Sequence, residues 1–284
     1  MSKRHELYER IRALTDIKGI LNAMKNLALM EVHKLGRFLS AQQRVVAGIE
    51  ETAADFFGFH PALLPSTVGA HPVFLLVGSE RGFCGDFNES LLAEFHRRRQ
   101  EGAVGEGDSA PLLITVGHKL AMKLGGDVAP DAVLAGPSVT EEVQSALLRV
   151  MEALRDLRQR RPVGAWLDLV VLSHGTGDDG RRVVLRRPFR EFGRPRASYS
   201  HPPILNVTPH ELAPRLLDQY LFAVLHEIFY TSLMAENRRR FQHMDQALQR
   251  LEKETGDLAR KHHVLRQEEI TQEIAVIMLS AEAV

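Results

Sequence analysis

Helix-breaking residues are concentrated in the middle of this 284-residue chain. All 13 prolines fall between Pro61 and Pro214, and 17 of the 21 glycines fall between Gly58 and Gly193. Because proline costs a helix interior about 3 kcal/mol and glycine about 1 kcal/mol, their scarcity at both ends permits two long, continuous helices. Helices of globular proteins seldom exceed about 20 residues, so the pattern indicates a coiled coil or a helical repeat.

Apolar residues at both ends recur at alternating intervals of three and four. The first series is Leu7, Ile11, Leu14, Ile17, Leu21, Met24, Leu27 and Met30. The second series is Phe241, Met244, Leu248, Leu251, Thr255, Leu258, His262 and Leu265, followed after a one-residue shift by Ile270, Ile274, Ile277 and Ala281. A period near 3.5 keeps one seam of a helix against a partner helix. The sequence therefore predicts a long antiparallel coiled coil between residues 1–57 and 209–284.

The carboxy-terminal helix carries a start signal. Thr208 stands at the cap position, Pro209 at the first helical position and Glu211 three residues after the cap, which is a capping box. From there only Pro214 and Gly256 interrupt the pattern. At about 1.5 Å per residue the helix would reach roughly 110 Å, so it must pair with the first helix and extend beyond an ordinary domain.

The middle of the chain reads as a small α/β domain over residues 70–205. Residues 73–77, 112–116 and 167–172 are short, continuous apolar runs, which are typical of parallel strands covered on both faces. Helical stretches at 88–99 and 139–160 separate them, and the second is predicted to begin with a capping box over 138–141. The alternation indicates a doubly wound α/β fold, with 181–186 as a charged edge strand.

Composition excludes several classes of protein. Lysine and arginine balance aspartate and glutamate at 36 each, so no net charge attracts nucleic acid or an anionic bilayer. The single cysteine, Cys84, excludes an intramolecular disulfide and fits a reducing compartment. No apolar run approaches the roughly 20 residues of a membrane span, and the charged start of the chain does not resemble a secretory signal. We therefore expect a cytoplasmic protein without a membrane span of its own.

Two loops that follow predicted strands are candidate sites. Residues 78–88 follow the first strand, where a dinucleotide-binding fold holds phosphate, but the spacing lacks both G-x-G-x-x-G and a Walker lysine. A structural turn is favoured over a phosphate loop, and within it a buried Cys84 is favoured over a nucleophile. Residues 173–180 could form a metal or hydrolase loop, although a flexible turn rich in glycine and aspartate is favoured.

Other polar residues lie on the long helices. His262 and His263 are adjacent and point in different directions, so they cannot chelate one ion, and His262 is interpreted as a polar seam residue that fixes register. Arg238, Arg239 and Arg240 are interpreted as a solvated helix face, with a docking patch for acidic partner loops as the sharper alternative. No set of general acid, base and nucleophile assembles, so neither catalysis nor a cofactor or metal is expected.

Three segments resemble the gamma subunit of F-type ATP synthases. They are residues 18–25, which resemble the start of that family's first coiled-coil helix, 79–88, which resemble its Asp-Arg-Gly-Leu-Cys-Gly-Gly-Leu-Asn turn, and 266–274, which resemble its Arg-Gln-x-x-Ile-Thr-x-Glu-Ile signature. Residues 236–237 and 243–245 also match in order. Asp86 departs from the pattern, since the family has glycine there, as does the stretch 246–248. These departures indicate a divergent branch, with the pumped ion, H⁺ or Na⁺, left open.

The resemblance implies a non-catalytic rotor shaft that couples ion flow to ATP synthesis or hydrolysis. Its partners would be the alpha and beta subunits of the catalytic head, the epsilon subunit and the membrane-embedded c-ring. The complex would hold it at the cytoplasmic face of the inner membrane. The implied contact residues are Lys18, Lys25, Arg266, Gln267, Thr271, Glu273, Ile274 and Ile277 towards the head, with residues 274–279 in an apolar sleeve, and Arg238, Arg239 and Arg240 at the foot.

Two rival interpretations use the same residues. A coiled-coil adapter or tether would share the architecture without the motor. A nucleotide-binding α/β enzyme with helical arms would need direct ATP or NAD binding by the isolated chain.

Overall fold

The chain forms two units in a computed structural model. The first unit comprises Met1–Ala28 with Arg240–Val284, and the second comprises Leu29–Arg239. The three-segment division predicted from the sequence (1–57, 70–205 and 209–284) follows helices and strands rather than these units, and it stays a prediction. The structure describes residues 3–64, 71–100, 111–125, 128–160, 167–175, 182–193 and 201–282.

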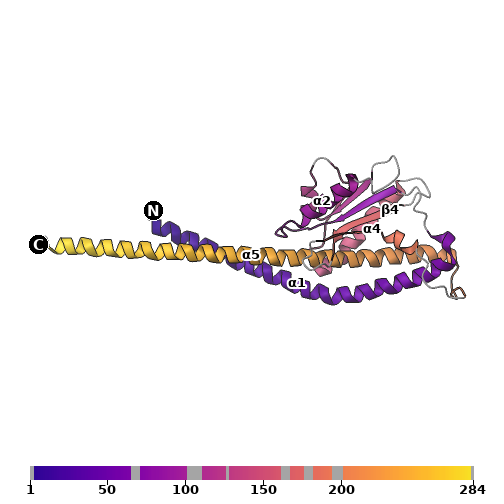
Figure 1. The fold of residues 1–284 in the computed structure, drawn as a ribbon, viewed down its shortest axis with the longest axis horizontal. Coiled ribbons are helices and arrows are strands. Elements are labelled where there is room, and N and C mark those ends of the chain that lie inside the picture. Colours follow the sequence, from indigo (N-terminus) through magenta and orange to yellow (C-terminus); the bar gives the residue numbers. More distant parts are fainter. Residues whose placement is uncertain are drawn as a thin grey trace. The chain divides into compact units, whose positions relative to one another are not determined.

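Both terminal segments are single long helices, as the scarcity of breakers predicts. Helix α1 spans Lys3–Phe59 and helix α5 spans Pro209–Glu282 (Figure 1). The predicted capping box begins α5. The Glu211 N–H donates to Thr208 Oγ1 at 3.4 Å, and the Thr208 N–H donates to Glu211 Oε2 at 3.3 Å. Pro214 lies early in the helix, so it interrupts little of the hydrogen-bond ladder.

The second unit contains a five-stranded sheet of order β3-β2-β1-β4-β5. Strands β1 to β4 pair in parallel and β5 pairs antiparallel with β4 at the edge. This confirms the doubly wound α/β fold with a charged edge strand; strand β3 and helix α3 were not predicted. The strands are β1 (His71–Val77), β2 (Leu112–Val116), β3 (Ala132–Leu134), β4 (Leu167–His174) and β5 (Val183–Arg186).

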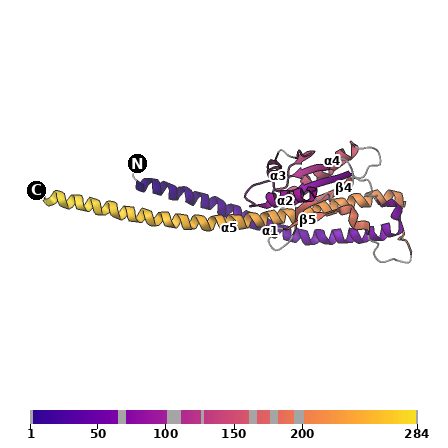
Figure 2. The same cartoon turned by 45° about the horizontal axis from the view of Figure 1, so that its top comes forward.

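Helices cover both faces of the sheet, which explains the continuous apolar runs. One face buries Phe74 and Leu76 against α2 (Phe87–Gln100) and α3 (His118–Lys123). The other face buries residues such as Leu75 against α4 (Val143–Gln159) and the parts of α1 and α5 in this unit. Within this unit α5 runs beside the sheet in both views (Figure 1 and Figure 2). Short 3₁₀ turns complete the chain at Pro61–Leu63, Thr140–Glu142 and Pro188–Gly193.

The capping box predicted over 138–141 is wrong. The Ser138 N–H donates to Glu142, at 2.7 Å, rather than to Glu141, and a 3₁₀ turn precedes α4. Glu31 of α1 caps this turn instead: its Oε2 accepts the Thr140 N–H at 3.0 Å and the Thr140 hydroxyl at 2.7 Å. Because the cap comes from a helix distant in sequence, it also fastens α4 to α1.

Candidate partner-contact surfaces

The α5 seam of the first unit follows the predicted series as far as Leu265. Met244, Leu248 and Leu258 are buried, and the other positions of the series are half-buried. The one-residue shift predicted after it is wrong, because Glu269 is the next half-buried position while Ile270 is 45% exposed. The alternating spacing therefore continues without a shift to one more position, Glu269. The α5 side chains from 270 to 278 are exposed.

The α1 seam differs from the prediction at its later positions. Ile17 is 44% exposed, Leu27 is 61% exposed and, in the second unit, Met30 is 65% exposed. Lys18 and Lys25 take seam positions instead. The seam positions of α1 are spaced alternately four and three residues apart, and this spacing includes both lysines. The seam positions of α1 in the first unit are Leu7, Ile11, Leu14, Lys18, Leu21, Lys25 and Ala28, and the predicted Met24 is also half-buried, beside Lys25.

Both seam lysines pair with carboxylates of α5. The Lys18 ammonium lies 2.7 Å from Glu252, and the Lys25 ammonium lies 2.7 Å from Asp245. Lys25 also lies over the ring of Phe241, 5.5 Å from its centroid, in a cation–π contact. The aliphatic stems can remain in the seam while the ammonium groups reach its edge. Their predicted role towards the catalytic head stays a prediction, and each already has a partner within the chain.

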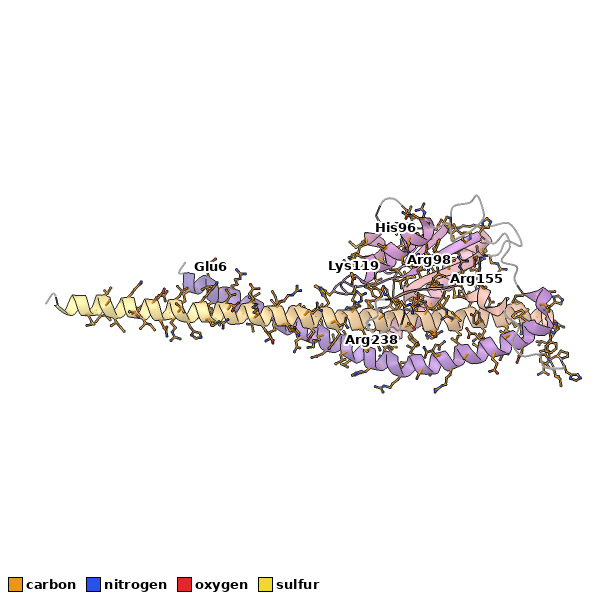
Figure 3. The ribbon with its side chains drawn as sticks, viewed as in Figure 1. Glu6, His96, Arg98, Lys119, Arg155 and Arg238 are labelled. Carbon is orange, nitrogen blue, oxygen red and sulfur yellow. The ribbon has the colours of Figure 1, made fainter. Side chains whose placement is uncertain are left out.

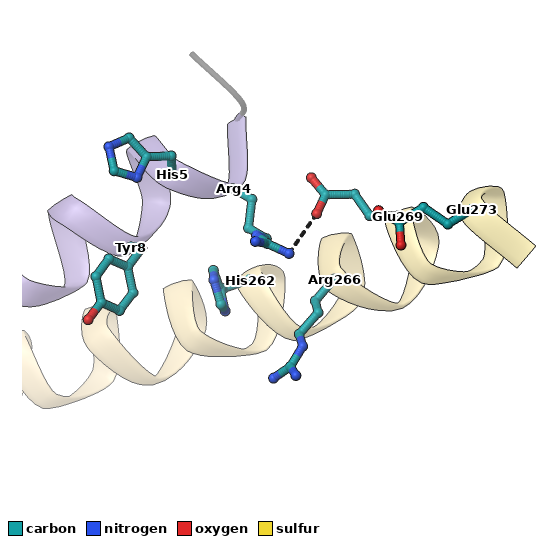
Figure 4. Close-up of a pocket in the computed structure, with 7 residues that line it drawn as sticks. All are labelled: Arg4, His5, Tyr8, His262, Arg266, Glu269 and Glu273. Atoms are coloured by element: carbon teal, nitrogen blue, oxygen red, sulfur yellow. Dashed lines mark ion pairs between the residues drawn. The ribbon is translucent and has the colours of Figure 1, made fainter.

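An open polar cavity of about 640 Å³ lies where α1 begins beside α5 (Figure 4). An ion pair between Arg4 and Glu269, 2.8 Å long, crosses it, and His262 lies in the seam with its ring centroid 6.3 Å from that of Tyr8. Both members of the ion pair are more than a third exposed, so it contributes little to stability. The cavity is lined by Arg4, His5, Tyr8, His262, Arg266, Glu269 and Glu273.

The remaining predicted head contacts lie on exposed turns of α5. Arg266 and Gln267 are exposed, and the Thr271 hydroxyl donates to the Gln267 carbonyl of its own helix at 2.8 Å. Ile274 is 53% exposed and Ile277 is 65% exposed. The structure thus brings the predicted polar and apolar residues onto neighbouring turns of one helix, and their contact with a partner stays a prediction.

The turn after β1, in the second unit, is held by buried polar and aromatic contacts. Asn88 and Ser79 exchange two hydrogen bonds: the Asn88 amide donates to the Ser79 hydroxyl at 2.8 Å, and the Ser79 N–H donates to Asn88 Oδ1 at 3.0 Å. Cys84 is buried and its thiol donates to the Ser79 hydroxyl at 3.3 Å. Phe87 stacks on His174 with ring centroids 3.9 Å apart. The burial of Cys84 is confirmed, and these contacts support the interpretation of the segment as a structural turn, whose lack of a phosphate-binding role stays a prediction.

These aromatic rings lie at the switch point between β1 and β4, the place where doubly wound folds usually bind ligands. Phe87 and His174 are fully buried there. Of the loop predicted over 173–180, Ser173 and His174 are buried in β4, while residues 176–180 lie outside the described part of the chain. Among the side chains the structure describes, no group of three or more His, Cys, Asp or Glu could hold a metal ion.

A second network at the same end of the sheet was not predicted. Glu80 accepts the Gly136 N–H at 2.8 Å and the His118 N–H at 3.1 Å, and its other oxygen lies 2.6 Å from His118 Nδ1. Burial alone would raise the pKa of Glu80, but these hydrogen bonds and the charge of His118 together lower it below its usual value. The carboxylate therefore ties the ends of β1, β2 and β3 together.

The arginine run on α5 is not the solvated face that we expected. Arg239 is 6% exposed and Arg240 is 7% exposed, so that interpretation is wrong for both, while Arg238 is half-buried (Figure 3). Arg239 forms an ion pair with Asp86, the residue that departs from the family turn. Its buried Nε has no hydrogen-bond partner within the part of the chain that the structure describes. The docking of these arginines onto a partner stays a prediction.

Comparison with known proteins decides the family. The model of the family described as ATP synthase matches residues 3–161 and 182–284. The chain belongs to the ATP synthase family. The resemblance found in the sequence motifs is thereby confirmed. No helix in the described ranges is long and apolar enough to cross a membrane.

Known gamma chains of ATP synthases match this chain along almost their whole length. The ATP synthase gamma chain of Thermosynechococcus vestitus is 26% identical, covering 100% of this chain and 99% of the relative. That of Acidithiobacillus ferrooxidans is 23% identical and covers 100% of both. A chain from the rotor of the Euglena gracilis mitochondrial ATP synthase superposes with a TM-score of 0.57 at 12% identity, covering 94% of this chain and 98% of that one. At this identity the superposition shows a shared fold.

Proposed function

We infer that this chain is the gamma-type rotor shaft of an F-type ATP synthase. The observation that carries the inference is the full-length similarity to gamma chains, which includes both terminal helices and the sheet between them. The motifs of the turn at 79–88 and of the helix at 266–274 occur in the same order as in that family.

A shaft acts by touching chemically identical catalytic sites differently as it turns. By linkage, rotation then changes nucleotide affinity, and nucleotide chemistry drives rotation. Moving a site from mostly closed to mostly open needs differential contact energy of about 5 kcal/mol. Exposed, chemically distinct turns along α5 can supply such contacts: Arg266 and Gln267 are polar, and Ile274 and Ile277 are apolar. We assign these residues, with Thr271 and Glu273, to the catalytic head.

Lys18 and Lys25 are also assigned to the surface that faces the catalytic head, and they have a second role within the chain. Each is partly exposed and bound to a carboxylate of α5. Their ion pairs link the two helices of the first unit, so a force applied to either helix acts on both. A partner carboxylate that approached either lysine would compete with Glu252 or Asp245.

The foot of the shaft is assigned to the α/β domain and the Arg238–Arg240 stretch. Its partners would be the epsilon subunit and the c-ring, which would hold the chain peripherally at the membrane, on the cytoplasmic face. The catalytic sites would belong to the head, and this chain would have none. Support for these finer assignments is the family membership and the place of the α/β domain in the sequence, between the end of α1 and the start of α5.

Native mass spectrometry of complexes purified from source membranes through a tag on this chain tests the function. We expect one copy of the chain with three alpha and three beta subunits. A homo-oligomer, or complexes lacking ATPase subunits, would overturn the proposal and favour the coiled-coil adapter. ATP or NAD binding by the isolated chain would favour the enzyme.

A further inference from the structure

Two arginines of the second unit meet one buried carboxylate at the start of β4. Asp168 Oδ2 accepts a hydrogen bond from Arg190 at 2.8 Å, and the Arg187 guanidinium lies 3.7 Å from the same oxygen. The Asp168 side chain is 7% exposed, that of Arg187 is 18% exposed and that of Arg190 is 48% exposed. One arginine balances the charge of the carboxylate. Fastening the turn after β5 to β4 therefore accounts for only one of the two cations.

The end of α2 adds a third cation to this place. Leu185 of β5 packs against the same apolar cluster as Phe95 of α2, so the carboxy-terminal turn of α2 lies near the end of β5. Arg98 belongs to this turn (Figure 3), and its charge acts on Arg187. Burial lowers the pKa of Arg187 below its usual value, and the charges of Arg190 and Arg98 lower it further, against the opposing effect of Asp168. The guanidinium groups therefore repel one another where solvent screens them weakly.

Positive charge exceeds negative charge among these residues. The arginine cluster comprises Arg97, Arg98, Arg187 and Arg190. Its first two members share Glu94, at 2.6 Å and 2.7 Å, as its last two share Asp168. Two carboxylates thus serve four guanidinium groups within the described part of the chain. Each guanidinium carries five N–H donors, so contact with one carboxylate does not saturate Arg98 or Arg190. The cluster has the charge and the donors to bind a further anion.

Phosphate is the anion that suits this arrangement. Guanidinium groups bind phosphate oxygens through paired N–H···O bonds. A diphosphate or longer group offers enough oxygens to meet arginines from α2 and from the turn after β5 together. The side chain of Arg187 is less exposed than those of Arg98, at 33%, and Arg190. A flat bilayer surface would therefore reach the outer arginines only, whereas a small soluble anion reaches all of them.

We propose that the arginine cluster binds a soluble compound with a diphosphate or polyphosphate group, held by Arg98 and Arg190 with Arg187 behind them. The bound phosphate offsets the repulsion among the arginines and joins the end of α2 to the turn after β5. A rotor shaft does not require such a ligand, so the inference goes beyond the proposed function and does not depend on it.

Isothermal titration of the full-length chain with sodium pyrophosphate in 0.15 M NaCl tests the proposal. We expect one saturable site with a Kd below about 1 mM. Arg98→Gln/Arg190→Gln should raise the Kd by roughly tenfold or more, because it removes two charge-assisted contacts. Arg155→Gln/Arg260→Gln is the matched control: it removes the same charge from exposed positions elsewhere and should change the Kd less than about twofold. No binding by the wild type, or equal weakening in both variants, would overturn the proposal.

Two further arms separate folding and lipid from phosphate binding. Arg98→Lys/Arg190→Lys keeps the charge, so it remains informative if the glutamine variant does not fold. Because an ammonium lacks the planar fork of a guanidinium, its Kd should rise by roughly threefold, and an unchanged Kd would overturn the proposal. Co-sedimentation with vesicles of phosphatidylglycerol and phosphatidylcholine tests the second source of phosphate. We expect pyrophosphate binding without sedimentation. Sedimentation without pyrophosphate binding would assign the cluster to lipid headgroups and overturn the soluble ligand.

Discussion

The ion pair between Arg239 and Asp86 joins α5 to the turn after β1, and removing the carboxylate should destabilise the second unit. The Arg239 side chain is 6% exposed, so Asp86→Ala leaves a buried guanidinium without its counter-charge. Breaking a buried pair typically costs about 3–5 kcal/mol. Asp86 is 72% exposed, which lets water screen the pair from one side. We therefore expect a loss of about 2 kcal/mol, or roughly thirtyfold in the unfolding equilibrium.

Urea unfolding of the full-length chain, followed by circular dichroism, measures the change. Arg239→Met keeps most of the side-chain volume and removes the charge, so Asp86→Ala/Arg239→Met should regain most of the loss. Asp257→Ala is the matched control, because Asp257 pairs with an Arg260 that is 81% exposed, and it should cost less than about 0.5 kcal/mol. The reasoning fails if Asp86→Ala costs no more than the control, or if the double variant is no more stable than Asp86→Ala.

Three further outcomes are expected. Arg266→Ala/Gln267→Ala should leave the circular dichroism spectrum unchanged but weaken coupling, and ion-driven ATP synthesis at the wild-type rate would contradict the assignment. Because the pKa of Glu80 is lowered in the fold, its stabilising effect is present above about pH 4.5 and is lost as the pH falls through the lower folded value. Glu80→Gln should therefore lower the urea midpoint at pH 7 and have a diminishing effect below pH 4.5, whereas an equal effect at both pH values would count against the network. Phe74→Ala removes a ring that is 1% exposed and should cost about 3–5 kcal/mol, against less than about 0.5 kcal/mol for Leu148→Ala; equal urea midpoints would refute the assigned core.

The parts of the fold that the sequence predicted are those encoded by long local patterns. The scarcity of proline and glycine predicted α1 and α5, and the continuous apolar runs predicted β1, β2 and β4. Strand β3 and helix α3 were not predicted, because they contain only 3 and 6 residues, too few to show a periodic pattern of apolar residues.

Features that depend on distant residues could not be predicted. The cap of the turn before α4 is Glu31, which is 109 residues from Thr140, and no local pattern encodes such a partner. Likewise, Arg239 looked solvated on its own helix because its counter-charge, Asp86, is 153 residues away. The departure of Asp86 from the family turn was the one signal that could have identified the pair.

The error in the α1 seam has a physical cause that bears on function. An apolar pattern alone assigns Ile17 and Leu27 to the seam, yet the structure gives the neighbouring places to Lys18 and Ala28. Lys25 takes a further seam position, and both lysines pair with α5. Ile17, Ile20 and Leu27 then remain 44%, 62% and 61% exposed on the same helix. In a free-standing helix pair, apolar side chains in the seam and lysines outside it would bury more apolar area and be more stable. Cations in the seam and apolar side chains outside it are the arrangement expected of a helix pair that other chains surround, and this favours the shaft over a free-standing adapter.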